Sequence, residues 1–338
     1  MLNKIAVSII TIAAASFAQT NSGYHMTGKI SIGGEGGWDY ISFDAQSHRL
    51  FASHGNHVSV ISTDSDKVIG DIPKTEGVHG IAVADELGRC FISNGRTSTV
   101  SIVDLKTLQL TDTIAVGKNP DAILYDPFSK RVFVCNGRSS DVSILDAATG
   151  KVVSTLPLNG KPEFSATDGK GKVFVNIEDK SEITAIDAKE MKVLATWPIK
   201  PGEEPSGLAI DAEHERLFAV CGNKLMVVVD GENGTVLASL PIGERVDGCA
   251  FDPGTGLAFS SNGEGTVTVV REETPSKYSV LETVKTQAGA RTITVDPTTH
   301  TLYLPTAEFG PAPEPTAEHP HPRPTIVPNT FVILKVQK

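Results

Sequence analysis

The 338-residue sequence has few cysteines and few aromatic residues. Aromatic side chains make up 6% of it, and the four cysteines, Cys90, Cys135, Cys221 and Cys249, lack the spacing of a metal site. No CxxCH heme-attachment motif, Walker loop, dinucleotide fingerprint or nucleophile elbow is present. These absences argue against a c-type cytochrome, a P-loop nucleotidase, a dinucleotide-binding enzyme and a serine hydrolase.

Long hydrophobic runs are also missing, except at the start of the chain. Residues 1–18 carry Lys4, an apolar run from Ile5 to Phe17 and a small-residue cleavage pattern ending at Ala18. This order is typical of a secretory signal peptide, and the run is short for a membrane anchor of about 20 residues. We therefore expect export to the periplasm or the cell exterior, and no membrane span after the signal is removed.

Positive charge is in deficit. Removal of Lys4 with the signal would leave 29 basic and 40 acidic residues, a formal charge of −11. Nucleic-acid affinity comes largely from Lys and Arg at phosphates, so the overall charge disfavours a nucleic-acid partner.

What the sequence does contain is a repeat. An Asp closes an apolar run before a turn seven times, at intervals of 41 to 44 residues: Asp44, Asp85, Asp126, Asp168, Asp211, Asp252 and Asp296. Each unit carries four short runs separated by turn-forming residues, as in "DAILY", "RVFVC", "DVSILD" and "KVVSTL" between Asp121 and Leu156. Cys221 and Cys249 fall on neighbouring units and are near enough in the repeat to form a disulfide.

Such a unit cannot bury both its faces alone, so the copies must stack, either in a linear solenoid or in a closed ring. The two ends of the chain favour a ring. The last unit has only three strands, and "YHMTGKISI" at residues 24–32 precedes the first unit as an unassigned strand. We predict an all-β, seven-bladed β-propeller of four-stranded antiparallel blades over residues 19–338, with the last blade closed by the N-terminal strand.

The repeats resemble those of the YncE-like, YVTN-repeat propeller family. The stretches "RCFISNGRTSTVSIVDLKT" and "RVFVCNGRSSDVSILDAATGK" follow that family's order of strand, turn, strand and Asp. The tetrad that gives the repeat its name is replaced here by FASH, FISN, FVCN and further variants. The resemblance implies the propeller fold and, because some members are associated with single-stranded DNA, an alternative DNA-binding function.

In a propeller the starts of the inner strands converge on one mouth of the central channel. The residues at that position in the seven units are Asp39, His79, Asp121, Glu163, Ser206, Asp247 and Arg291. We predict that they line a ligand-binding mouth. Arg96 and Arg138, in turns between the second and third strands of adjacent units, are further candidates for an anionic ligand.

The last unit differs from the others in the same region. Residues 307–329, from Ala307 to Asn329, form an insertion in which seven of 23 residues are Pro. Proline stiffens such a segment toward extended conformations, and long loops in compact domains are usually functional or disordered. We expect the insertion to emerge beside the channel mouth as a lid or rim.

Histidines raise the possibility of a metal. His319 and His321 lie in the insertion of the last unit, which a ring would place beside His54 and His57 of the first unit and near His79 of the second. Imidazoles with a carboxylate suit Zn or Cu, while the ring of carboxylates suits Ca²⁺.

The preferred interpretation is an exported, monomeric and non-enzymatic propeller that binds a small molecule or peptide at the channel mouth, with no catalytic residue assigned. The alternatives are a metal-dependent propeller enzyme at the same mouth, either a lactonase-like hydrolase or an oxidoreductase, and single-stranded DNA binding. The sequence does not identify the ligand or establish a cofactor.

Overall fold

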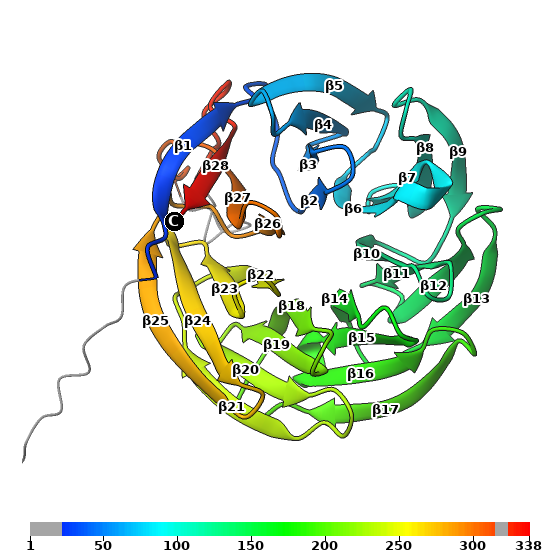
Figure 1. Ribbon diagram of the computed structural model, residues 1–338. Coiled ribbons are helices and arrows are strands. Elements are labelled where there is room, and N and C mark those ends of the chain that lie inside the picture. The colour runs from blue at the N-terminus through cyan, green and yellow to red at the C-terminus, as the bar shows by residue number, and fades with distance from the viewer. Residues whose placement is uncertain (1–21, 315–323) are drawn as a thin grey trace, which may run out of the picture.

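A computed structural model describes residues 22–314 and 324–338 and confirms the predicted fold (Figure 1). Seven four-stranded antiparallel sheets surround a central axis, and helical structure is limited to two short 3-10 turns in the described residues. The predicted signal at residues 1–18 lies outside the described residues. Within these residues, no helix is both long enough and apolar enough to cross a bilayer.

Each blade runs from an inner strand at the axis to an outer strand at the rim. Blades 1 to 3 consist of β2 (Ile41–Asp44), β3 (Arg49–His54), β4 (His57–Ser62) and β5 (Lys67–Pro73); β6 (Val78–Ala84), β7 (Arg89–Asn94), β8 (Thr99–Asp104) and β9 (Leu110–Ala115); and β10 (Pro120–Asp126), β11 (Arg131–Asn136), β12 (Asp141–Asp146) and β13 (Val152–Pro157). Blades 4 and 5 consist of β14 (Pro162–Thr167), β15 (Lys172–Ile177), β16 (Glu182–Asp187) and β17 (Lys192–Pro198), then β18 (Pro205–Asp211), β19 (Arg216–Cys221), β20 (Leu225–Asp230) and β21 (Val236–Pro241). Blades 6 and 7 consist of β22 (Val246–Asp252), β23 (Leu257–Asn262), β24 (Thr266–Thr274) and β25 (Lys277–Lys285), then β26 (Thr294–Asp296), β27 (Thr301–Thr306), β28 (Val332–Gln337) and β1 (His25–Ser31). The 3-10 turns are η1 (Asp85–Leu87) and η2 (Glu178–Lys180).

The core lies between the blades. The second strand of blades 1 to 6 places a phenylalanine at the same position, and all six side chains are fully buried: Phe51, Phe91, Phe133, Phe174, Phe218 and Phe259. A sheet of this size exposes two apolar faces, and stacking against the next blade covers both. The sequence repeat is therefore the repeat of one packing unit.

The repeated Asp at the end of each inner strand has a local structural role. Asp168 is buried, and its Oδ1 accepts hydrogen bonds from the backbone N–H groups of Lys170, Gly171 and Lys172 at 2.7 to 3.0 Å. A carboxylate that accepts several backbone N–H groups fixes the turn to the second strand. Both Asp168 and Asp85 lie just beyond their inner strands, and Asp85 differs because it begins the 3-10 turn η1.

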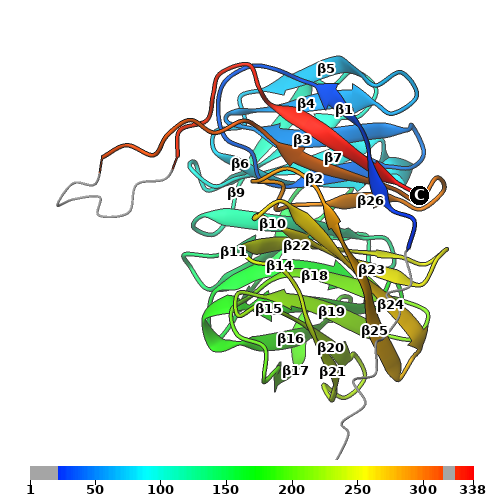
Figure 2. The same cartoon turned by 90° about the vertical axis from the view of Figure 1, so that its left-hand side faces the viewer.

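The Pro-rich insertion connects β27 to β28. Figure 2 shows this connection projecting from the face of the ring that is turned away from the viewer in Figure 1. Its described base is paired, since Phe309 and Ile326 form an antiparallel bridge and the Gly310 N–H donates to the Thr325 carbonyl at 2.8 Å. Phe309 also contacts Trp38, with ring centroids 5.9 Å apart. The insertion thus emerges on the face where the inner strands begin.

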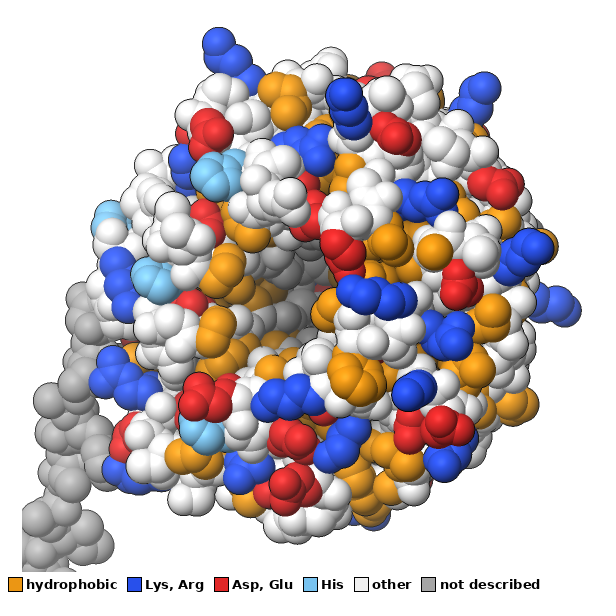
Figure 3. Space-filling model, turned by 45° about the vertical axis from the view of Figure 1, so that its right-hand side comes forward, with side chains coloured by type: hydrophobic (Ala, Val, Ile, Leu, Met, Phe, Trp, Pro, Cys, Tyr) orange, Lys and Arg blue, Asp and Glu red, His pale blue; other side chains and the backbone are white. Residues whose placement is uncertain are grey.

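The inner strands surround a central hollow. Figure 3 shows it opening on the other face of the ring, with hydrophobic side chains around its wall. The channel therefore has two different ends, one where the inner strands begin and one where they finish.

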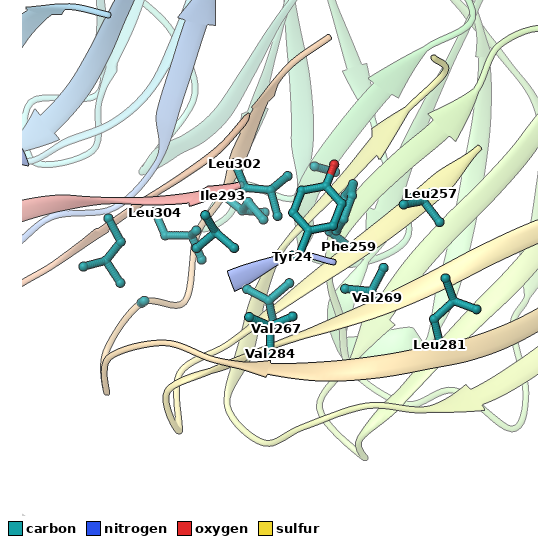
Figure 4. Packing of buried hydrophobic residues seen from close by; sticks show 14 residues of the cluster. Tyr24, Leu257, Phe259, Val267, Val269, Leu281, Val284, Ile293, Leu302 and Leu304 are labelled. Atoms are coloured by element: carbon teal, nitrogen blue, oxygen red, sulfur yellow. The ribbon is translucent and has the colours of Figure 1, made fainter. Parts of the chain in front are cut away.

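The N-terminal strand closes the ring. β1 pairs antiparallel with β28, with Lys29 opposite Leu334 and Ile30 opposite Ile333. Just before β1, Tyr24 is 4% exposed and packs edge to face on Phe259 of blade 6, with ring centroids 5.2 Å apart (Figure 4). The first described segment is thereby fastened to the last two blades.

The four cysteines are buried free thiols. Cys221 and Cys249 therefore do not form the disulfide that their places in the repeat permitted. Burial raises the pKa of both thiols, so both remain protonated small hydrophobic side chains.

Candidate functional site

The channel mouth gathers six of the seven predicted ring positions into one charged group. We call this group the mouth ring: Asp39, His79, Asp121, Glu163, Asp247 and Arg291. Each member comes from a different blade and lies at or just before the start of the inner strand. Their proximity results from the sevenfold arrangement, because successive members are 40 to 84 residues apart in the chain.

Arg291 links three blades of the mouth ring. Its Nη2 lies 3.0 Å from Asp39 Oδ1, and its Nε lies 2.6 Å from Asp247 Oδ2. Nη2 also donates to the Trp38 carbonyl at 2.9 Å. Both carboxylate contacts fall within charge-assisted hydrogen-bond distance, so Arg291 is fully engaged by its own protein.

His79 lies between two carboxylates. Its Nδ1 is 2.5 Å from Asp39 Oδ2 and 3.5 Å from Asp121 Oδ1. Burial opposes protonation of the ring, but the hydrogen bond with Asp39 and the charges of Asp121 and Asp39 outweigh it and raise the pKa of His79 to about 9. At neutral pH His79 is therefore a cation.

The remaining carboxylates bind protons more tightly than usual. Burial, with the charge of Asp39, raises the pKa of Asp121 well above its ordinary value and that of Asp247 to about 6. Burial likewise raises the pKa of Glu163 to about 7, although Lys161 acts in the opposite direction. Carboxylates behave in this way when nearby positive charge does not balance their own.

Two residues that the sequence reasoning missed complete the site. Lys161 Nζ lies 2.7 Å from Glu163 Oε2 and also contacts Glu178, so one cation is shared by two acids and the cluster has one carboxylate in excess. The sequence did contain a signal for Lys161. It stands two residues before Glu163, and side chains two residues apart in an extended chain point to the same side.

Tyr40 is the second missed residue. It packs on Phe164, with ring centroids 5.1 Å apart, and these two side chains come from blades 1 and 4. Burial, followed by the charges of Asp121 and Asp39, raises the pKa of Tyr40 far above its ordinary value. The phenol thus stays neutral beneath the mouth ring, and the aromatic pair lies across the channel.

Three other predicted residues take different places. Ser206 occupies the ring position of blade 5, but its hydroxyl donates to the Val246 carbonyl of the next blade at 3.1 Å. Arg96 pairs with Glu76 at 3.8 Å and has 74% of its side chain exposed. Arg138 is also exposed. For neither arginine does the described structure record a contact with the mouth ring.

The predicted histidine cluster divides into two groups. His54 and His57 contact one another with their rings tilted by 38° and ring centroids 4.7 Å apart, while His79 belongs to the mouth ring. His54 is 1% exposed, and burial lowers its pKa to about 4. A Cβ at Gly34 would lie 2.8 Å from His54 Cε1, so the loop over this ring requires glycine. His319 and His321 lie outside the described residues.

One subset of the mouth ring has the composition of a metal site. Asp39, His79 and Asp121 each offer a ligand atom, and these atoms lie within 4.8 Å of one another. Two carboxylate oxygens and an imidazole nitrogen suit Zn²⁺ or a similar transition ion once the imidazole proton is released.

Comparison with known proteins identifies one family. The sequence model described as the cytochrome D1 heme domain matches residues 48–295. Among solved structures, hydrazine synthase of Kuenenia stuttgartiensis is similar at 16% identity and a TM-score of 0.69, over 86% of this chain and 95% of that one. The U3-55K structure is similar at 10% identity and a TM-score of 0.74, over 93% of this chain and 99% of that one. The structure of the RRP9 WD40 repeats is similar at 11% identity and a TM-score of 0.75, over 94% of this chain and 99% of that one. At these identities the structures show a shared fold. No curated protein matches the chain.

The residues of this channel do not fit a heme. A heme iron needs an axial ligand such as a neutral His, a thiolate, Met or a phenolate. His79 Nδ1 is engaged by Asp39 and its Nε2 packs against Gly95, where a Cβ would lie 2.5 Å away, and His54 is enclosed by its neighbours. In the hollow, Cys249 is buried, and Tyr125 donates its hydroxyl to Glu86. The propionates of a heme would also meet a mouth that already carries excess negative charge.

Proposed function

The chain belongs to the cytochrome D1 heme domain family, and because its channel does not fit a heme we propose that it binds a small organic cation at the channel mouth. The ligand class is an alkylammonium group, carried by a free amine or by a peptide. One observation carries this proposal: the mouth ring, taken with the contacting Lys161 and Glu178, holds five carboxylates and three cations, so the acids outnumber the bases by two.

The chemistry of the floor agrees with an organic ligand. Tyr40 and Phe164 present aromatic surface beneath the carboxylates. An ammonium group is attracted to carboxylates through charge-assisted hydrogen bonds and to aromatic faces through the ring quadrupole. Asp121 is the central contact in this proposal, because it is 8% exposed and the other mouth carboxylates all raise its pKa.

Calorimetric titration with putrescine and with a Gly-Lys dipeptide tests the proposal, using 1-butanol as the uncharged comparison. The folded chain should bind the amines saturably and should not bind the alcohol. Asp121→Asn should weaken amine binding at least about tenfold, the loss of about 1.4 kcal/mol expected for one charge-assisted contact. Asp112→Asn, on the exposed outer strand β9, should bind as the wild type does. Equal amine affinity in the two variants would refute the proposal.

A divalent cation is the second candidate, favoured by the mutual approach of Asp39, His79 and Asp121. Metal binding would have to displace the proton from His79, so affinity should rise with pH through the His79 pKa of about 9. Elemental analysis of the purified protein, followed by Zn²⁺ and Ca²⁺ titration at two pH values, distinguishes the candidates, because an organic cation does not require that proton release. A metal-dependent hydrolase or oxidoreductase would follow only from the second candidate.

We further propose export, on the signal pattern of residues 1–18, and a monomeric state. The resemblance to YncE-like propellers supports the same fold, and a single-stranded DNA partner is the less favoured proposal because an acidic mouth repels phosphates. A mobility-shift assay at low salt tests the DNA partner directly.

A further inference from the structure

A second group of metal-ligating side chains lies at the end of the blades opposite the mouth ring. Asp211 ends the inner strand β18 of blade 5, His214 follows in the turn to β19, and Glu272 lies on β24 of blade 6. Each offers one ligand atom, and the three atoms lie within 4.8 Å of one another. We call this group, one imidazole and two carboxylates from two blades, the blade 5–6 cluster.

The other units of the repeat show that His214 is not needed to form the turn. In four of them the Asp that closes the inner strand accepts a hydrogen bond from a Ser or Thr hydroxyl three residues later: Asp44 from Ser47, Asp126 from Ser129, Asp252 from Thr255 and Asp296 from Thr299. In blade 5 that place is taken by His214, whose Nδ1 contacts Asp211 Oδ2. Since a hydroxyl holds this turn elsewhere, the turn alone does not explain the imidazole.

Glu272 departs from the repeat as well. The third strands of blades 2 to 5 end at an Asp that pairs with the first residue of the second strand: Asp104, Asp146, Asp187 and Asp230. In blade 6 the equivalent residue is Arg271, and β24 continues to Thr274. This extension of β24 brings the Glu272 carboxylate of blade 6 to Asp211 of blade 5.

One oxygen of the Glu272 carboxylate has no hydrogen-bond donor. Its Oε1 is buried, and none of the described residues donates to it. Asp211 beside it is 4% exposed. Burial, followed by the charge of Asp211, raises the pKa of Glu272 to about 7. Buried polar atoms usually have a partner, and between two carboxylates that partner is a proton or a cation.

Arg216 does not supply that cation. It is near enough to oppose the rise in the pKa of Glu272, but its Nη1 lies 3.0 Å from Asp230 Oδ2 and its Nε donates to the Pro275 carbonyl at 2.9 Å. The charge of Arg216 is therefore matched by Asp230. Within the part of the chain that the structure describes, Arg216 forms no ion pair with Asp211 or Glu272.

We propose that the blade 5–6 cluster binds Zn²⁺ or a similar divalent transition ion, which joins Asp211 and His214 of blade 5 to Glu272 of blade 6. One nitrogen and two oxygens suit such an ion, whereas Ca²⁺ favours a larger set made only of oxygens. The His214 side chain is 45% exposed, so the ion enters from solvent and keeps water as its fourth ligand. This site is separate from the mouth ring and does not depend on the function proposed for it.

Titration of the untagged chain with Zn²⁺, by calorimetry and in competition with a chromogenic chelator, tests the site. His214→Ser introduces the residue type that holds the same turn in blades 1 and 3, and Glu272→Gln lets an amide donate to Asp211, so both variants should fold. Each variant removes one of three ligands and should weaken Zn²⁺ binding at least about tenfold. Zn²⁺ should also raise the midpoint of thermal unfolding of the wild type more than that of either variant.

Two control variants separate this cluster from other residues. His300→Asn changes a similar pair, because His300 Nδ1 lies 2.8 Å from Asp252 Oδ2, but the described residues give that pair no third ligand, so Zn²⁺ binding should match the wild type. Asp121→Asn alters the mouth ring, and His214→Ser should cause the same loss of affinity in that background as in the wild type.

Circular dichroism identifies a variant that fails to fold, and the other cluster variant then decides. Absence of saturable Zn²⁺ binding would overturn the proposal and assign the contact between Asp211 and Glu272 to a shared proton. Wild-type affinity in a folded cluster variant, or an equal loss in His300→Asn, would also overturn it. Loss of binding in Asp121→Asn alone would assign the ion to the mouth ring and leave the blade 5–6 cluster without one.

Discussion

Replacing His79 by Gln removes the titrating group at the centre of the mouth ring, and its effect on stability depends on pH. The pKa of His79 is about 9 in the folded chain, against an ordinary value of 6.5. Because the folded pKa is the higher one, the folded protein holds this proton while the unfolded chain releases it. The stabilisation is complete below pH 6.5 and is lost as the pH rises through 9.

The magnitude follows from the size of this difference. One pKa unit corresponds to about 1.4 kcal/mol, so the shift is worth about 3 kcal/mol at most. The His79 side chain is 28% exposed, and solvent screening lowers the expected value to about 2 kcal/mol. The pKa values of Glu163 and Asp247 are also raised in the folded chain, so their contributions to the free energy of unfolding change with pH in the same direction as that of His79. Those contributions are lost by about pH 7, whereas most of the His79 contribution is lost at higher pH.

Urea unfolding followed by circular dichroism, at several values from about pH 6 to about pH 10, measures this dependence. The free energy of unfolding of the wild type should exceed that of His79→Gln by about 2 kcal/mol at the lower limit, and the difference should vanish at the upper limit. His25→Gln, at an exposed position of β1, should follow the wild type throughout. Parallel curves for wild type and His79→Gln would refute the assignment of His79 as a cation held by Asp39 and Asp121.

Two further predictions concern the fold. Tyr24→Ala should lower the free energy of unfolding by about 3 kcal/mol, since it removes a buried aromatic side chain from the contact that closes the ring of blades. Tyr24→Phe should lower it by only about 1 kcal/mol, because it removes only the hydrogen bond to the His300 carbonyl. Similar losses for the two variants would show that the aromatic contact does not stabilise closure. Asp168→Ala removes the acceptor of three backbone N–H groups, so it should lower the free energy of unfolding by about 2 kcal/mol and the midpoint of urea unfolding with it. An effect as small as that of Asp112→Ala would contradict the role of Asp168 in fixing the turn.

The blade structure could be predicted because it is local. The interval between successive Asp residues, the four apolar runs and the turn residues all lie within about 40 consecutive positions, and each reports directly on a strand or a turn. The same regularity located Asp39, His79 and Arg291, since equivalent positions of a repeat occupy equivalent places around a ring.

The contacts between blades were less accessible to prediction. His54 and His57 face one another across a hairpin turn, yet their sequence neighbourhood also permitted a cluster with His79. Arg96 occupies a turn on the channel side, but its guanidinium extends into solvent toward Glu76. Side-chain direction at a rim depends on the twist of each sheet, which a residue interval does not encode.

The sequence by itself determined the number of blades, the strand that closes the ring and the acidic character of the mouth, because these follow from periodicity and residue type. Only the tertiary structure decided which charges meet and that Tyr40 and Phe164 lie across the channel. These features join residues of different blades, 40 or more positions apart in the chain, and their burial, distance and protonation exist only once seven separate sheets share one axis.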